Sequence, residues 1–184
     1  MTRNSGEPAR TRVRAAAFGA AAAILLALGI PGCGVYGTRP GNLPSHIRTI
    51  AIPTFENRTT QAGLDEEITK SVVDRFVADN NLRVVGEPEA DAVLTGAVVR
   101  YENSVFGFTA DVRAEEYRVS LTVSCRLYDR AKNRELWRDE NLTKTTNYYV
   151  VEVPGQPAQT EVDGRTEAVK KISDEILSRT VDVW

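Results

Sequence analysis

Few residues of this 184-residue chain have the types and spacing needed for catalysis. His46 is the only histidine, and it precedes a β-branched segment, where we expect it to be solvated. Cys125 stands at an inward position of an alternating segment, so we interpret it as a buried thiol and not as a nucleophile. The acidic pairs at 66–67 and 115–116 are neighbours in sequence, and nothing in their spacing indicates a general acid and a general base. We therefore expect no catalytic residue and no enzyme, with a carboxylate-dependent hydrolase as a distant alternative.

The other cysteine, Cys33, follows an apolar run and precedes small residues. Four arginines come first, and the uncharged run from Ala15 to Ile30 has 16 residues, short of the roughly 20 that span a membrane. This layout is typical of a signal peptide, and a retained anchor helix is the alternative. Ile30-Pro31-Gly32-Cys33 resembles a bacterial lipobox, which implies that residues 1–32 are cleaved and that Cys33 carries diacylglycerol and an acyl chain. In bacterial lipoproteins, an aspartate directly after the lipidated cysteine favours retention in the inner membrane. Gly34 stands at this position, so the resemblance implies the periplasmic face of the outer membrane.

Without residues 1–32, the chain has 152 residues, which is enough for one domain with a core. It keeps 19 basic and 24 acidic residues, a net charge of −5 that gives no indication of nucleic-acid binding. One histidine and one thiol supply neither a disulfide nor a usual zinc ligand set. We therefore expect no metal and no cofactor beyond the lipid on Cys33.

The mature chain divides into a tether and a single domain. Residues 33–46 are rich in glycine, proline and polar residues and are interpreted as the lipidated tether, and residues 47–184 as the domain. A strand is predicted from Ile47 to Pro53. A helix is predicted over 64–80, because an apolar residue recurs at every fourth position and forms a stripe on one helix face. Val73 and Val77 flank this stripe. The stripe consists of Leu64, Ile68, Val72 and Phe76.

The second half of the domain is predicted to contain more strands and a final helix. Strands are expected at 82–85, 92–101, 116–129 and 136–148, and the third of them alternates clearly between apolar and polar residues. The last helix has an apolar stripe made of Val169, Ile172, Ile176, Leu177 and Val181. This order favours an α+β fold: a mixed sheet of four or five strands with two helices packed on one face.

The stretch LPSHIRTIAIPTFENRTTQAGLDEEIT, residues 43–69, closely follows CGVYG and resembles the start of the LptE family of lipopolysaccharide-assembly lipoproteins. That family typically begins with Cys-Gly-Tyr, a tether, a strand ending in IAIPxFxNxT and an acidic helix start; here Val35 precedes Tyr36. The element order resembles the family over residues 33–184. Beyond about residue 103, the resemblance rests on pattern alone.

The resemblance implies a structural and binding function. LptE proteins plug the large outer-membrane β-barrel LptD, help it assemble, and assist insertion of lipopolysaccharide into the outer leaflet. The implied location is the outer membrane, lipid-anchored, on the periplasmic side and in the barrel lumen. The alternative is a lipoprotein that assembles or activates another envelope machine, such as a curli-type exporter or a peptidoglycan synthase.

The resemblance also implies contact residues, since the family is described as binding lipopolysaccharide through basic side chains. On the polar face of the 116–148 strand pair, the candidates are Arg118, Arg126, Arg138 and Lys144, which are alternatively ordinary solvated charges. Phe106 and Phe108 lie between two predicted strands, where exposure would be costly. They are expected to contact the barrel or lipid, or alternatively to fold back onto the core.

Overall fold

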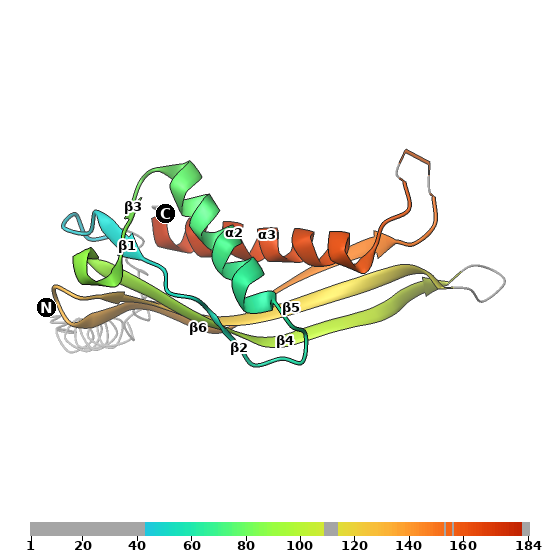
Figure 1. The fold of residues 1–184 in the computed structure, drawn as a ribbon, viewed down its shortest axis with the longest axis horizontal. Helices are drawn as coiled ribbons and strands as arrows, with labels where there is room; N and C mark the ends of the chain where they lie inside the picture. Colours follow the sequence, from blue (N-terminus) through green and yellow to red (C-terminus); the bar gives the residue numbers. More distant parts are fainter. Residues whose placement is uncertain (1–42, 109–113, 153, 156, 182–184) are drawn as a thin grey trace, which may run out of the picture. The chain divides into compact units, whose positions relative to one another are not determined.

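The computed structural model describes residues 43–108, 114–152, 154–155 and 157–181, which belong to one compact unit. The predicted signal peptide, Cys33 and the tether up to residue 42 lie outside the described residues. The elements in chain order are β1 (Thr49–Ala51), β2 (Glu56–Asn57), α2 (Leu64–Asp79), β3 (Arg83–Val84), the 3₁₀ turn η1 (Glu87–Glu89), β4 (Ala92–Phe108), β5 (Ala114–Asp129), β6 (Arg134–Tyr149) and α3 (Glu161–Val181) (Figure 1).

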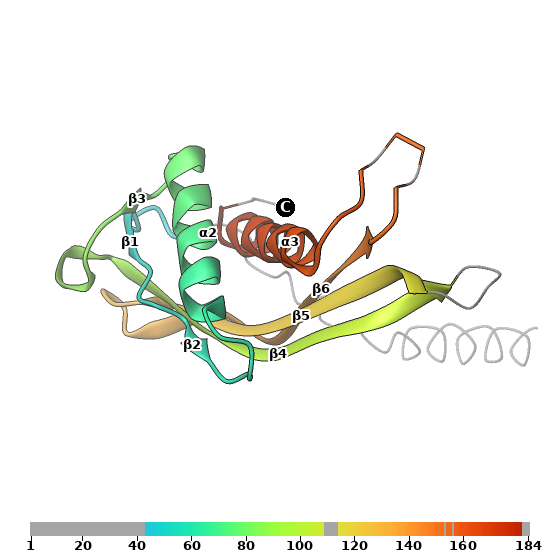
Figure 2. The ribbon, with the colours of Figure 1, turned by 45° about the vertical axis from the view of Figure 1, so that its right-hand side comes forward.

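The strands of the described part form one mixed sheet with the order β3-β1-β4-β5-β6, and β2 also pairs with β4. β1 runs parallel to β3 and β4, whereas β4, β5 and β6 are antiparallel. Both helices lie on the same side of this sheet (Figures 1 and 2). The predicted α+β fold is therefore confirmed. The strand predicted at 82–85 is present as β3. The sheet has six strands because the two-residue β2 also pairs with β4, and so short a segment has no detectable periodicity.

α2 forms where an apolar residue recurs at every fourth position. The buried positions are Leu64, Ile68, Val72 and Phe76. Gly63 and Asn80 flank the helix with positive φ angles of 79° and 59°, and the backbone N–H of Asn80 donates to the Phe76 carbonyl at its end. The stripe predicted from sequence is confirmed. Val77, which was expected to flank it, is 61% exposed and contributes little to the core.

α3 packs beside α2 through polar as well as apolar contacts. The Arg165 Nε atom lies 2.9 Å from Glu67 Oε2 of α2, and the Ser173 hydroxyl donates to that of Ser71 at 2.8 Å. The predicted apolar stripe is confirmed, since its members are buried or packed against the core: Val169, Ile172, Ile176, Leu177 and Val181. The two helices therefore form one cover over the sheet.

A close approach between Phe55 and Gly96 fixes the loop between β1 and β2. Gly96 lies on the covered side of β4, opposite Cys125, and a Cβ atom there would overlap the Phe55 ring. The Phe55 N–H donates to the Thr69 hydroxyl of α2 at 2.9 Å. This loop is thus held by both α2 and β4, and only glycine fits beneath the ring.

Extra residues interrupt the long strands near their middles. Between Val98 and Arg100, β4 has one residue more than β5, and between Asp139 and Leu142, β6 has one residue more than β5. An extra residue shifts the alternation of side chains, so positions on its two sides change faces. These two bulges determine which polar residues face away from the helices.

Candidate functional site

We use the term open face for the surface of β4, β5 and β6 that faces away from the helices. In β5 it consists of Arg118, Ser120, Thr122, Ser124, Arg126 and Tyr128. The residues between them, such as Val119 and Leu121, are fully buried against the helices. The alternation predicted for this strand is therefore confirmed, and Arg118 and Arg126 lie on its polar side as expected.

The basic residues predicted on β6 lie on opposite faces of the sheet. Arg138 pairs with Arg126 on the open face, whereas Lys144 pairs with Leu121 on the helix-covered face. The Lys144 ammonium lies 2.7 Å from Glu175 of α3, and this hydrogen bond holds the pKa of Glu175 below its ordinary value. The prediction that Lys144 belongs to the polar face is therefore wrong, because the β6 bulge reverses the alternation between residues 138 and 144.

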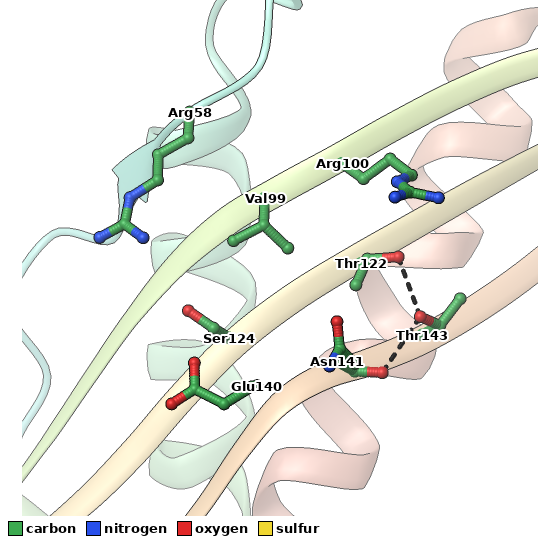
Figure 3. Close-up of a pocket in the computed structure, with 8 residues that line it drawn as sticks. All are labelled: Arg58, Val99, Arg100, Thr122, Ser124, Glu140, Asn141 and Thr143. Atoms are coloured by element: carbon green, nitrogen blue, oxygen red, sulfur yellow. Dashed lines mark hydrogen bonds between the residues drawn. The ribbon is translucent and has the colours of Figure 1, made fainter.

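A hollow of about 470 Å³ lies in the middle of the open face, between the two bulges (Figure 3). It is lined by Arg58, Val99, Arg100, Thr122, Ser124, Glu140, Asn141 and Thr143. The hydroxyls of Thr122 and Thr143 are 2.9 Å apart, and Thr143 also donates to the Asn141 carbonyl at 3.1 Å. The extra residue of β4, Val99, lines one side, and the bulged segment of β6 lines the other. The hollow is therefore a consequence of the strand irregularities.

The charges around the hollow are unequally paired. Arg58 lies 2.7 Å from Glu56, and Glu140 lies 3.0 Å from Arg138. Arg100 is exposed, and within the described ranges its guanidinium has no hydrogen-bond or ion-pair partner. The hollow thus combines hydroxyl groups with one unpaired positive charge. This arrangement can bind a group that carries a single negative charge.

Phe106 and Phe108 lie within a strand and not in a loop, because β4 continues to Phe108. The ladder with β5 extends the strand beyond the predicted end at Tyr101, although alternation there is weak. The two phenylalanines are 49% and 61% exposed, so they do not fold back onto the core. The Arg118 guanidinium lies 3.5 Å from the centre of the Phe106 ring, in a cation–π contact.

The segment that leads into β1 is fixed by two carboxylates, one of which is fully buried. Asp129 is fully buried, and its Oδ2 atom lies 3.0 Å from His46 Nε2. Burial alone would raise the pKa of Asp129, but the Lys132 N–H and His46 outweigh it, so this pKa is lowered. Asp91 accepts the Thr49 N–H at 2.9 Å. The expectation of a solvated His46 is therefore wrong, because the side chain bonds to a buried carboxylate that is 83 residues away.

The other candidate chemical groups are structural in character. Cys125 is buried as predicted, and burial raises its pKa to about 12, which suppresses thiolate chemistry. No group of three or more His, Cys, Asp or Glu in the described part of the chain is placed to hold a metal ion. Of the acidic pairs, Glu67 is in the ion pair with Arg165 described above. Among the helices that the structure describes, none is both long and apolar enough to cross a membrane.

The fold and the open face define a class of protein: an α+β domain whose sheet is covered by helices on one side and polar on the other. A sequence profile then gives the family. The chain belongs to the LptE family, described as lipopolysaccharide-assembly, whose profile matches residues 47–180. The matched range spans β1 to α3 and therefore includes both the helical cover and the open face.

Solved structures of similar fold have low sequence identity to this chain. A protein from Xanthomonas campestris is 12% identical with a TM-score of 0.52, over 76% of this chain and 89% of that one. A hypothetical protein from Chlamydia trachomatis is 13% identical with a TM-score of 0.50, and the match covers 72% of this chain and 95% of that one. Lipoprotein B from Nitrosomonas europaea is 20% identical with a TM-score of 0.46, and the match covers 79% of this chain and 88% of that one. These likenesses concern the fold alone. No curated protein matches the sequence.

Proposed function

We propose that this protein is an outer-membrane lipoprotein that plugs the LptD β-barrel, helps this barrel assemble, and assists insertion of lipopolysaccharide into the outer leaflet. In this proposal, residues 1–32 are a cleaved signal peptide and Cys33 is the lipidated residue. Residues 33–46 tether the lipid to the domain at 47–184, which lies on the periplasmic side and in the barrel lumen. Membership of the LptE family supports the role in lipopolysaccharide assembly.

The observation that carries the proposal is the polar character of the open face. Three long strands present hydroxyls and guanidiniums on the side that neither helix covers. Buried polar groups need partners, and an apolar partner surface would leave these groups without any. The lumen of an outer-membrane barrel is polar, because its strands alternate between apolar and polar side chains. A barrel wall can therefore cover the open face without leaving its groups unpaired.

We assign the contacts to arginines of the open face and to the exposed aromatic pair. Arg126 has no partner in the described ranges, whereas a contact by Arg138 would compete with its ion pairs to Glu135 and Glu140. Arg118, Arg126 and Arg138 lie on the open face, where guanidiniums can bind carboxylates of the barrel or phosphates of lipopolysaccharide. The exposed Phe106 and Phe108 supply an apolar contact for the barrel or the lipid at the end of the same hairpin. Lys144 is not part of this set, since it lies on the helix-covered face, where its ammonium is bound to Glu175.

The test is an affinity purification of the full-length tagged lipoprotein from detergent-solubilised outer membranes, with mass spectrometry of what it retains. The proposal predicts a large β-barrel of the LptD type in a one-to-one ratio with the bait. A variant without the lipidation site, Cys33→Ala, serves as a control for the membrane anchor, and we expect it to reach the barrel poorly. Recovery of a secretion pore or a peptidoglycan synthase in place of the barrel would overturn the proposal.

A further inference from the structure

We propose that the hollow on the open face receives the side chain of an aspartate or glutamate from the inner wall of the partner barrel, and that Arg100 binds its carboxylate. This inference rests on the proposed plug function. It adds a specific receptor on this chain and the chemical type of the group that enters it.

Several groups in the hollow can donate hydrogen bonds to a carboxylate. Thr143 donates its proton to the Asn141 carbonyl, so Thr122 is the donor in the pair of threonine hydroxyls. Within the described residues, neither the Ser124 hydroxyl, the Asn141 side-chain amide nor the Arg100 guanidinium has a hydrogen-bond partner. Each of these groups can donate. An ionised carboxylate only accepts, at two oxygens, and a guanidinium can bind both of them.

The charge balance of the hollow favours a single negative charge. Figure 3 shows Arg58 and Arg100 on the β4 side and Glu140 on the β6 side. Glu56 neutralises Arg58 and Arg138 neutralises Glu140, so Arg100 is left without a partner among the residues that the structure describes. A phosphate monoester, with a charge of about −1.5 to −2, would exceed this single positive charge. The hollow therefore fits a carboxylate better than a lipid phosphate.

The size and position of the hollow indicate that the carboxylate belongs to a polypeptide. The volume of about 470 Å³ has room for a carboxylate side chain together with the chain that presents it. The hollow opens in the middle of the open face, which in the proposed function lies against the barrel wall. Lumen-facing side chains of barrel strands are polar and stand at alternate positions. One of them, projecting toward β5, can enter between the two bulges.

The decisive variant is Arg100→Glu in the full-length tagged lipoprotein, expressed with its natural barrel. We expect recovery of the barrel per bait to fall about tenfold, because the variant places two carboxylates against each other. The control is Arg83→Glu, an exposed arginine of β3 that is outside the hollow and outside the assigned contacts, and its recovery should stay within about twofold. Equal melting temperatures of Arg100→Glu and the parent protein would show that the loss is not due to unfolding.

A photo-crosslinker identifies the occupant. With p-benzoylphenylalanine in place of Asn141, we expect a crosslink to a barrel strand that carries an inward aspartate or glutamate. Replacing that residue with arginine should restore the recovery of the Arg100→Glu lipoprotein. A crosslink to lipopolysaccharide, or unchanged recovery of the barrel by Arg100→Glu, would overturn this inference while leaving the plug function intact. Failure of the parent protein to retain any barrel would instead contradict the proposed function, and this inference with it.

Discussion

The two faces of the β4–β6 sheet differ in how completely their side chains find partners within the chain. On the covered face, Val119 and Leu121 are fully buried, and the one ammonium there, that of Lys144, is bound to Glu175. On the open face, Arg100 and Arg126 have no partner among the residues that the structure describes. The covered face therefore supplies the free energy of folding, whereas the open face retains groups that another molecule can bind.

The same contrast appears in the strand geometry. The bulge residue Val99 of β4 and the bulged 140–141 segment of β6 both line the open-face hollow. The strand segments beside them keep regular pairing and carry the core residues. A bulge disrupts the hydrogen bonding between neighbouring strands at one point, and it redirects the side chains beside it. Substitutions on the covered face should therefore reduce stability, and those on the open face should reduce binding.

The largest effect on stability is expected from the core beneath α2. Phe76→Ala removes a fully buried ring and should lower the free energy of unfolding by about 3–5 kcal/mol. Val77→Ala, the adjacent position with a 61% exposed side chain, is the matched control and should stay within about 0.5 kcal/mol. Urea denaturation of the purified protein measures both. Similar losses at the two positions would contradict the assignment of the covered face.

A smaller effect is expected from Asp129, where a polar group is fully buried and fully paired. The lowered pKa in the folded state means that Asp129 stabilises the fold above its unfolded pKa of about 3.9 and loses this contribution as the pH falls through the folded value. Asp129→Asn should lose about 2 kcal/mol at neutral pH. Its unfolding free energy should also fall less steeply than that of the parent protein below about pH 4. An unchanged acid dependence would show that the His46 and Lys132 contacts are unimportant.

The contact between Phe55 and Gly96 tests how tightly the covered face is packed. Gly96→Ala places a methyl group into the Phe55 ring and should cost about 1–3 kcal/mol. Phe55→Leu in the same protein should recover part of this loss, which a double-mutant cycle measures. Ser124→Ala, a similarly small change on the open face, should alter stability by less than about 0.5 kcal/mol. An equal cost at the two sites would remove the distinction between the faces.

The smallest effect on stability is expected at the exposed aromatic pair. Phe106→Ser combined with Phe108→Ser should lower the free energy of unfolding by no more than about 1 kcal/mol, since both side chains are exposed and the variant removes one exposed cation–π contact. The same variant should retain less barrel or lipopolysaccharide in the affinity purification. If recovery is unchanged and the isolated protein is less stable, these residues are structural and not a contact surface.

The core elements could be predicted from the sequence because their patterns are regular. The one-in-four stripe of α2 and the alternation of β5 both repeat over several periods, and burial follows the pattern in each. The two-residue strand β2 was not predicted because it is too short to have a pattern, and it forms because β4 offers a parallel partner. β3 is equally short, but it lies within the predicted segment 82–85 and pairs in parallel with β1.

The open face could be predicted only in part. Arg118 and Arg126 lie in the regular part of β5 and were assigned correctly to the polar side. Lys144 was misplaced, and Arg100 was missed, because each follows a bulge that shifts the alternation by one residue. The adjacent valines 98 and 99 are the one local sign of the β4 bulge, since they break strict alternation. The bond between His46 and Asp129 joins distant positions and leaves no local signal.

Thiol labelling tests whether a partner covers the open face. Thr145 is exposed on this face, so Thr145→Cys provides a thiol for a water-soluble maleimide. The native Cys125 gives little background, because burial raises its pKa to about 12. We expect rapid labelling of Thr145→Cys in the protein purified alone and strong protection when it is purified with the barrel. Equal labelling in the two preparations would show that the open face is not covered by the barrel.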